Sequence, residues 1–181
     1  MSRVGNKEII IPAGVEIKVE DSLVTVKGAK GTLTQVIDDA RITVEIEGTT
    51  LKVKRAEESG VVKAKHGLYR ALIANMITGV TSGYAKTLLV NGVGYKTTVA
   101  GGKLTLNIGF SHPIVVEAIA GIEITVPQNN EIVISGIDKA AVGQFAASIR
   151  ALKKPEPYHG YGIQYKDEVV ERKEGKAAGK K

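Results

Sequence analysis

The chain has 181 residues, 43% of them apolar and 24% charged, so it is globular rather than disordered and could form one domain or two small ones. Cysteine and tryptophan are absent and aromatic residues make up 4%, which excludes disulfides, thiolate metal ligands and cysteine nucleophiles and argues against a large ligand cavity. The net charge is +6, and residues 150–181 carry nine Lys and Arg against five Asp and Glu, as expected of a polyanion-binding arm and equally of a basic solubilising tail.

The N-terminal segment lacks the pattern of a targeting or membrane segment. The apolar run Ile9–Ile11 follows Glu8 and ends at Pro12, far short of the roughly 7 to 15 apolar residues of a secretory signal. No other run approaches the roughly 18 apolar residues of a membrane-spanning helix. We therefore expect a soluble, cytoplasmic protein with no membrane partner.

Two β-hairpins are predicted from alternating apolar residues, one in each half of the chain. Residues 42–46 alternate strictly, a turn follows at 47–50, and the alternation resumes at 51–54. The second half repeats this pattern around Gln128–Asn130. Gly101-Gly102, between two further alternating stretches, predicts a tight hairpin turn.

One amphipathic helix is predicted after each of these hairpins. The first has an apolar stripe opposite a polar face, with Val61, Ala64, Leu68, Leu72 and Met76 on the stripe and Lys63, His66 and Arg70 on the polar face. The second follows an N-cap at Asp138, ends before Pro155, and has an apolar stripe of Val142, Phe145, Ile149 and Leu152. Residues 81–84 are the predicted hinge between the halves.

The two halves align with each other at an offset near 80 residues. The matching positions are Ile42, Val44 and Ile46 with Ile122, Ile124 and Val126, and Gly67, Tyr69, Ala71 and Ile73 with Gly143, Phe145, Ala147 and Ile149. The predicted fold is therefore α+β, with two repeated small domains, each a mostly antiparallel sheet covered by one helix, and an extended basic C-terminal tail. We expect the repeats at residues 1–82 and 83–165 and the charged tail at 166–181.

The segment 153–165 is the most informative part of the chain. Two prolines and two glycines within ten residues predict neither regular helix nor regular strand. Three of the six tyrosines nevertheless lie there, flanked by Lys153, Lys154 and Lys166. Lysines neutralise phosphates and tyrosines stack on bases, so this composition is typical of an RNA-contacting loop, with a solvated tail as the alternative.

The Pro-x-Pro-Tyr-x-Gly-x-Gly-Ile-x-Tyr spacing of residues 155–165 resembles the C-terminal signature of the bacterial-type large ribosomal subunit protein six family. Further segments from end to end of the chain resemble that family, namely residues 1–5, 11–15, 91–95, 109–113 and 168–173. The resemblance implies a structural constituent of the large ribosomal subunit that binds large-subunit ribosomal RNA near the translation-factor region. The implied partners are that RNA, neighbouring large-subunit ribosomal proteins and nearby translation factors.

Together, composition and resemblance give a set of expected RNA-contacting residues. They are Lys153, Lys154, Pro157, Tyr158, His159, Gly160, Tyr161, Gly162, Gln164, Tyr165, Lys166, Arg172, Lys173, Lys176, Lys180 and Lys181, with Ser111 and His112 in a second loop. His159, Tyr161 and Gln164 stand where the family usually carries basic residues, so we expect stacking and hydrogen bonding there instead of charge. We expect Tyr158 and Tyr161 to stack on RNA; the competing outcome is that Tyr158 packs into its own domain.

No motif in the chain indicates catalysis or a cofactor. The three histidines are too widely spaced for a metal site, and His66 is expected on the helix surface. Residues 91–96 lack the Gly-Lys-Ser/Thr ending of a phosphate-binding loop. We interpret Asp38-Asp39 as turn residues and Glu57-Glu58 as residues at the start of a helix. We expect no enzyme activity, no cofactor, no metal and no small-molecule substrate.

Two other classes of function are alternatives to RNA binding. The first is a non-ribosomal, two-domain adaptor for other proteins with a basic solubilising tail, and the second is an enzyme, for which no convergent polar set exists. Salt separates RNA binding from the adaptor, because affinity for phosphates falls steeply with salt whereas an apolar protein interface responds little.

Overall fold

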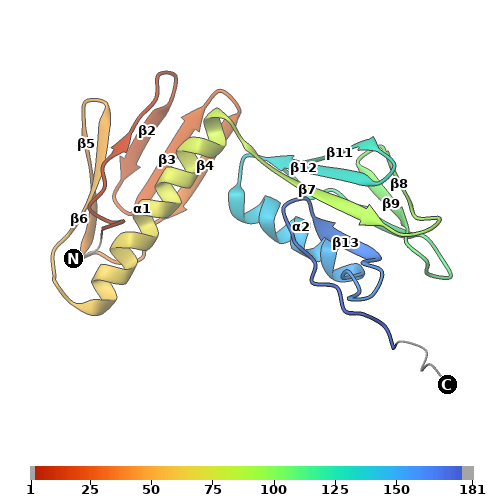
Figure 1. Cartoon of the computed structure of the whole chain (residues 1–181). Coiled ribbons are helices and arrows are strands. Elements are labelled where there is room, and N and C mark those ends of the chain that lie inside the picture. Colours follow the sequence, from red (N-terminus) through yellow and green to blue (C-terminus); the bar gives the residue numbers. More distant parts are fainter. Residues whose placement is uncertain (1–2, 177–181) are drawn as a thin grey trace. The chain divides into compact units, whose positions relative to one another are not determined.

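The computed structural model describes residues 3–176 of the chain, which form two α-helices and a series of short strands (Figure 1). Every strand pair whose register is resolved in these residues is antiparallel. The predicted α+β class, with two helices and antiparallel sheets, is therefore confirmed. The chain divides into two compact units, Met1–Tyr84 with Ile137–Lys139, and Ala85–Gly136 with Ala140–Lys181.

The first unit contains two three-stranded sheets and the helix α1 (Gly60–Thr81). One sheet has the order β1-β6-β5, from β1 (Ile9–Ile10), β6 (Thr50–Arg55) and β5 (Ile42–Glu47). The other has the order β2-β3-β4, from β2 (Glu16–Glu20), β3 (Leu23–Gly28) and β4 (Gly31–Val36). Apolar side chains of α1 and both sheets form one core, in which Val24, Leu51 and Ile73 are fully buried.

The second unit repeats this order of elements and adds one strand. One sheet has the order β10-β9-β8, from β10 (Ile114–Glu117), β9 (Lys103–Asn107) and β8 (Lys96–Ala100). The other has the order β11-β12-β7-β13, from β11 (Ile122–Gln128), β12 (Glu131–Gly136), β7 (Tyr84–Asn91) and β13 (Gly162–Tyr165). The helix α2 (Lys139–Leu152) buries Val142, Phe145, Ala146 and Ile149.

The predicted hairpins are confirmed. β5 pairs with β6 in the register Val44↔Val53, and β11 pairs with β12 across the turn at Asn129 and Asn130. The glycine pair at 101–102 joins β8 to β9, where Ala100 lies opposite Lys103. Alternating burial along these strands matches the alternation of the sequence, because one face of each sheet packs on its core.

The predicted apolar face of α1 is confirmed in part, since Met76 is buried and Leu72 packs against the core. Its N-terminal half was wrong by about one residue in phase. Val61 and Leu68 are exposed, whereas Val62, Tyr69 and Ile73 are buried. His66 was expected at the surface, but it is 2% exposed. Its Nε2 lies 2.8 Å from the carbonyl oxygen of Val53 and its Nδ1 lies 2.8 Å from Nη1 of Arg55. Two polar partners permit this burial, and a hydrophobicity pattern alone cannot reveal them.

The expectation that residues 153–165 contain no regular strand was also wrong. Gly162–Tyr165 forms β13, which pairs with β7 from Gly162↔Asn91 to Tyr165↔Leu88. Ile163 on this strand is fully buried. Both prolines precede the strand, so they remove none of its backbone donors. The predicted end of the second helix before Pro155 is confirmed, since α2 ends at Leu152.

Candidate nucleic-acid interface

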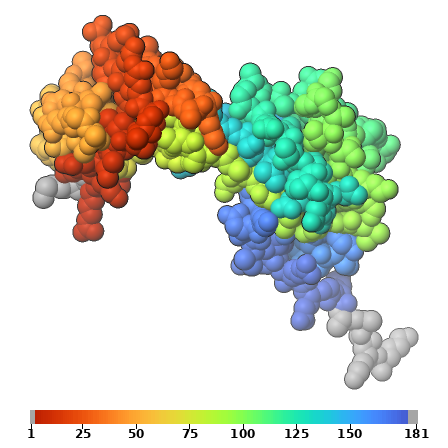
Figure 2. Space-filling view, turned by 90° about the horizontal axis from the view of Figure 1, so that it is seen from above, coloured from red at the N-terminus to blue at the C-terminus, as the bar shows by residue number. Residues whose placement is uncertain are grey.

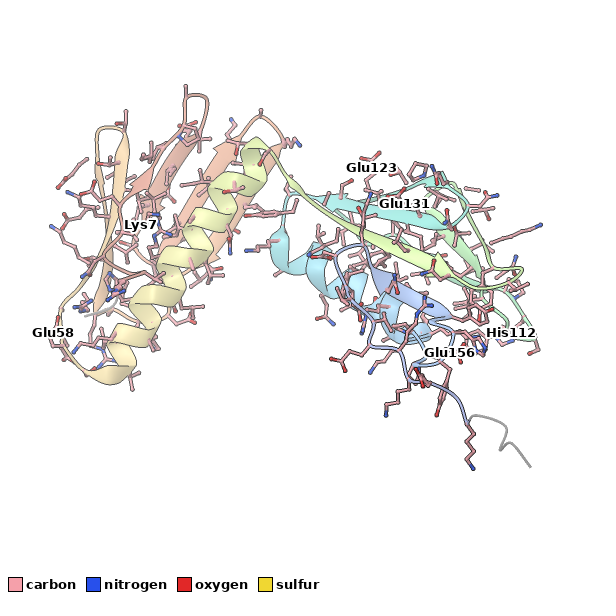
Figure 3. All side chains as sticks on the ribbon, in the orientation of Figure 1. Lys7, Glu58, His112, Glu123, Glu131 and Glu156 are labelled. Atoms are coloured by element: carbon pink, nitrogen blue, oxygen red, sulfur yellow. The ribbon has the colours of Figure 1, made fainter. Side chains whose placement is uncertain are left out.

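The candidate interface centres on the loop 153–161, which connects α2 to β13 and carries the labelled Glu156 (Figure 3). The two ends of this loop are joined by a hydrogen bond from the backbone amide of Ile163 to the carbonyl of Lys153, at 2.8 Å. Inside it, the amide of Glu156 donates to the carbonyl of Tyr161 at 3.0 Å, and the amide of Gly160 donates to the carbonyl of Glu156 at 3.1 Å. The loop is therefore closed by its own backbone.

Two glycines give the loop its shape. Gly160 has φ of +74°, in the region that side chains other than glycine rarely adopt. Gly162 has φ of +144°, and a Cβ atom there would lie 2.6 Å from the carbonyl oxygen of Lys154. These two members of the predicted site therefore act through the backbone.

Two aromatic rings stack at the surface of this loop. The ring centroids of His159 and Tyr161 are 5.3 Å apart, with an angle of 16° between the ring planes. Nδ1 of His159 lies 3.5 Å from Oε1 of Glu156. Tyr158 is 54% exposed, so the competing outcome in which it packs into its own domain is wrong.

Arg172 and Lys173 of the predicted tail lie on this loop. The backbone amide of Lys173 donates to the carbonyl of Pro157 at 2.8 Å. The guanidinium of Arg172 lies beside Gly160, where a Cβ atom would be 3.2 Å from Nη2 of Arg172. Figure 2 shows the C-terminal residues, in blue, as part of the visible surface of the second unit. Lys154, Arg172 and Lys173 are all exposed in this region.

An ion pair fixes the segment that runs from β13 to the hydrogen bond between Lys173 and Pro157. Nε of Arg150 on α2 donates to Oε2 of Glu168 at 2.8 Å, and the amide of Tyr165 donates to the same oxygen at 3.0 Å. The bond from Arg150 holds the pKa of the Glu168 carboxyl below its ordinary value. Arg150 and Lys86 also lie over the half-buried ring of Tyr165, 5.6 and 5.7 Å from its centroid.

Lys153 is bonded within the second unit. Its Nζ donates to the carbonyl of Ile108 at 2.7 Å and lies 5.0 Å from the ring centroid of Tyr95 and 5.3 Å from that of Phe110. The ammonium group thus connects the end of α2 to two other loops. This geometry favours a positioning role for Lys153 over direct contact with a phosphate.

The remaining predicted residues are distributed around this centre. Ser111 and His112 are exposed between β9 and β10, with Oγ of Ser111 3.3 Å from Nδ1 of His112 (Figure 3). Lys166 forms an ion pair with Glu131 at 3.1 Å, Gln164 is half-buried on β13, and Lys176 is exposed. Lys180 and Lys181 lie outside the described residues.

Sequence reasoning missed Phe110 as a candidate. Its ring is exposed in a Gly-Phe-Ser-His-Pro segment, next to Ser111, and lies near Lys153. The signal was available, because an aromatic residue between glycine and proline cannot be buried by regular structure, which is the argument applied to the tyrosines.

Neither a metal site nor a membrane-spanning helix is present in residues 3–176. No group of three or more His, Cys, Asp or Glu side chains is arranged to hold a metal ion there. Neither helix in that range has the length and apolar character needed to cross a membrane.

Comparison with known proteins identifies the family. The sequence profile described as ribosomal protein L6 matches residues 11–83 and 91–166, one match in each half of the chain. The chain belongs to the ribosomal protein L6 family. The predicted family resemblance is therefore confirmed. Proteins of this family are structural, non-enzymatic components of the ribosome, in agreement with the expectation that the chain is not an enzyme.

Curated relatives match over nearly the whole chain. Large ribosomal subunit protein uL6 of Caldicellulosiruptor bescii is 53% identical over 177 residues, covering 98% of this chain and 97% of that protein. The protein of the same name from Mesoplasma florum is 51% identical over 181 residues, covering 99% and 100%. That from Bacillus cereus is 53% identical over 179 residues, covering 98% and 99%.

Proposed function

We propose that this protein is a structural constituent of the large ribosomal subunit in the cytoplasm, and that it binds large-subunit ribosomal RNA through its second unit. Its relatives are named as large ribosomal subunit proteins and match almost the full chain, which supports this assignment. Its partners are then large-subunit ribosomal RNA and neighbouring ribosomal proteins. The site carries no reaction; it holds RNA segments in a fixed arrangement.

The main support for an RNA-binding surface is that exposed cations and aromatic rings lie together on one closed loop. Tyr158, His159 and Tyr161 lie within four residues of each other, and Arg172 and Lys173 return to the same loop from the tail. Cations contribute phosphate neutralisation and rings contribute stacking, the two components of RNA recognition. The predicted basic tail contributes Arg172 and Lys173 to this contact, and residues 83–165 with the tail form the RNA-binding half.

The proposed location, near the region where translation factors bind, rests on the family resemblance. Site-directed probing can test it, because the chain has no cysteine of its own. A single cysteine at position 158 would carry a tethered hydroxyl-radical source in reconstituted large subunits. Cleavage should fall on nucleotides in the factor-binding region, while a matched probe at the exposed Ala13 of the first unit should give a different pattern.

Co-sedimentation tests the assignment itself. The purified full chain should sediment with large subunits lacking this protein, and its affinity for large-subunit ribosomal RNA should fall steeply with salt. The adaptor alternative predicts binding to a protein partner with little salt dependence. Failure to enter the large subunit, together with salt-insensitive binding, would overturn the proposed function.

A further inference from the structure

A loop that binds only phosphates uses cationic groups. Phosphate binding therefore does not explain the stacked ring pair of His159 and Tyr161. Both rings are at the surface, with 69% of the His159 side chain and 38% of Tyr161 exposed. Aromatic rings at an exposed loop normally cost free energy by presenting apolar surface to water. Here the two rings stack on each other, and the exposed part of the pair is available for contact with a third ring.

The loop that carries the pair is ordered before any ligand binds. Three backbone hydrogen bonds close it, from Ile163 to Lys153, from Glu156 to Tyr161 and from Gly160 to Glu156. The amide of Lys173 adds a fourth from the tail. A preordered platform loses little conformational entropy when a ligand stacks on it, which raises the affinity obtained from a single contact.

A cation lies next to the platform. The Arg172 guanidinium is beside Gly160, the residue between the two stacked rings, and within the described part of the chain it has no carboxylate partner. The bidentate fork of a guanidinium matches a phosphate. Gly160 keeps this place open, because a Cβ atom there would be 3.2 Å from Arg172.

We propose that the His159–Tyr161 stack is a docking platform for one unpaired base of RNA, and that Arg172 contacts the adjoining phosphate. The inference rests on the proposed function and refines it. In a duplex, both faces of each base are covered by neighbouring bases, so a surface stack can accept only a base that is unpaired or turned out. The loop thereby recognises a structural feature of RNA, and phosphate charge alone does not account for its binding.

The choice of RNA over a protein partner follows from the surroundings of the platform. Glu156, Lys154 and Lys173 make its rim polar, and a protein interface would need a wider apolar patch. An unpaired nucleotide supplies both a flat π-face and a phosphate, which matches one ring stack with one neighbouring guanidinium.

Filter binding of large-subunit ribosomal RNA to the full chain tests the platform. Tyr161→Ala and His159→Ala should each weaken binding by about 10-fold, because base stacking is lost, and should leave the salt slope unchanged. Tyr161→Phe keeps the ring and should bind like the parent protein. Arg172→Gln should lower the salt slope by about 0.7 to 0.9, as expected for one lost phosphate contact.

Val169→Ala is the control, since Val169 is an apolar residue that is 91% exposed on the segment between β13 and Arg172 and is not one of the expected RNA-contacting residues. It should change affinity less than about twofold, below the usual range for a stacked base. Acylation of ribosomal RNA 2′-hydroxyls should show an unpaired nucleotide that becomes ordered with the parent protein and with Val169→Ala, but not with Tyr161→Ala.

Equal losses for Val169→Ala and Tyr161→Ala, or no loss for Tyr161→Ala at an unchanged melting temperature, would overturn the platform and leave the proposed function intact. Absence of ribosomal RNA binding by the parent protein would overturn the proposed function itself.

Discussion

The two units differ most at one sheet edge. In the first unit, β1 is the outer strand of the sheet β1-β6-β5. In the second, β7 holds the same place beside β12 but is itself covered by β13. The repeat offset of about 80 residues places Ile9–Ile11 opposite residues 89–91, so these edges correspond in sequence as well as in topology. One added strand of four residues is what anchors the candidate loop to the second unit.

The corresponding edge of the first unit is fixed by side chains. Arg70 on α1 donates from Nε to the carbonyl of Lys7 at 3.0 Å and from Nη2 to the carbonyl of Glu8 at 3.3 Å. A guanidinium there satisfies backbone acceptors that a pairing strand would otherwise take. The same repeat therefore has an edge closed by side-chain bonds in one unit and by a strand that carries a binding loop in the other.

The largest expected effect comes from removing the anchor of β13. Ile163 is fully buried, so Ile163→Ala should destabilise the second unit by about 2 to 5 kcal/mol and weaken binding to large-subunit ribosomal RNA. Hydrogen exchange of the β7 and β13 amides would measure the local stability.

The matched control lies on the corresponding edge of the first unit. Ile10 is 75% exposed on β1, so Ile10→Ala should change stability by less than about 0.5 kcal/mol. Similar losses from the two substitutions would show that the strand addition does not distinguish the two edges.

A second substitution tests the first unit. His66→Leu removes a buried imidazole from its two polar partners, the Val53 carbonyl and the Arg55 guanidinium. It should destabilise the first unit by about 1 to 3 kcal/mol, the cost of unsatisfied buried groups, with ribosomal RNA affinity unchanged. Chemical denaturation and filter binding measure the two quantities; a drop in affinity without unfolding would assign an RNA contact to the first unit.

Lys153→Met tests the connection between α2 and the neighbouring loops. It preserves most of the aliphatic length but removes the bond to Ile108 and the contacts with two rings, so we expect a loss of about 1 to 2 kcal/mol. NMR shifts of the Phe110 and Ser111 amides should change. If the salt slope of RNA binding falls while these shifts stay constant, Lys153 is a phosphate contact instead.

The smallest expected effect is on the stability of the two units at acidic pH. The pKa of Glu168 is lowered by the bond from Arg150, so its ionised form stabilises the folded second unit above the ordinary pKa of 4.5, and this stabilisation is lost as the pH falls through the lowered value. Glu168→Gln should therefore reduce the stability of the second unit at neutral pH. It should also make the free energy of unfolding of that unit depend less on pH in the acidic range.

Asp39 provides the parallel test in the first unit. Hydrogen bonds from Arg41 and Lys65 lower its pKa, so Asp39→Asn should flatten the acid limb of the first unit below the ordinary pKa of 3.8. Urea unfolding from neutral to acidic pH measures both. If the free energy of unfolding of either variant falls with acid as it does in the parent protein, the ion pair of that residue does not contribute to the pH dependence.

Strands in which apolar and polar residues alternate, so that one face is buried, could be predicted from the sequence, as Val44 and Val53 show. The helix face could be predicted only in part, because apolar residues on α1 lie on two adjacent stripes. The packing of Val62, Tyr69 and Ile73 into the core, together with the bond of His66 to β6, decides which is buried. β13 was missed because Gly162 was read as a strand breaker, although the residues after it pair freely. The contacts of Lys173 and Arg172 with the loop join residues that no local pattern connects.

The central claim is that the second unit and its loop, and not the first unit, bind ribosomal RNA. Two variants with the same net charge test it most directly, each replacing four exposed cations by glutamine: Lys154, Lys166, Arg172 and Lys173 in the second unit, or Lys7, Lys18, Lys27 and Lys54 in the first. The salt dependence of affinity for large-subunit ribosomal RNA should fall by about 0.7 to 0.9 per lost contact in the second-unit variant and stay constant in the first-unit variant. An equal fall in both variants, or a fall in the first-unit variant alone, would contradict the account.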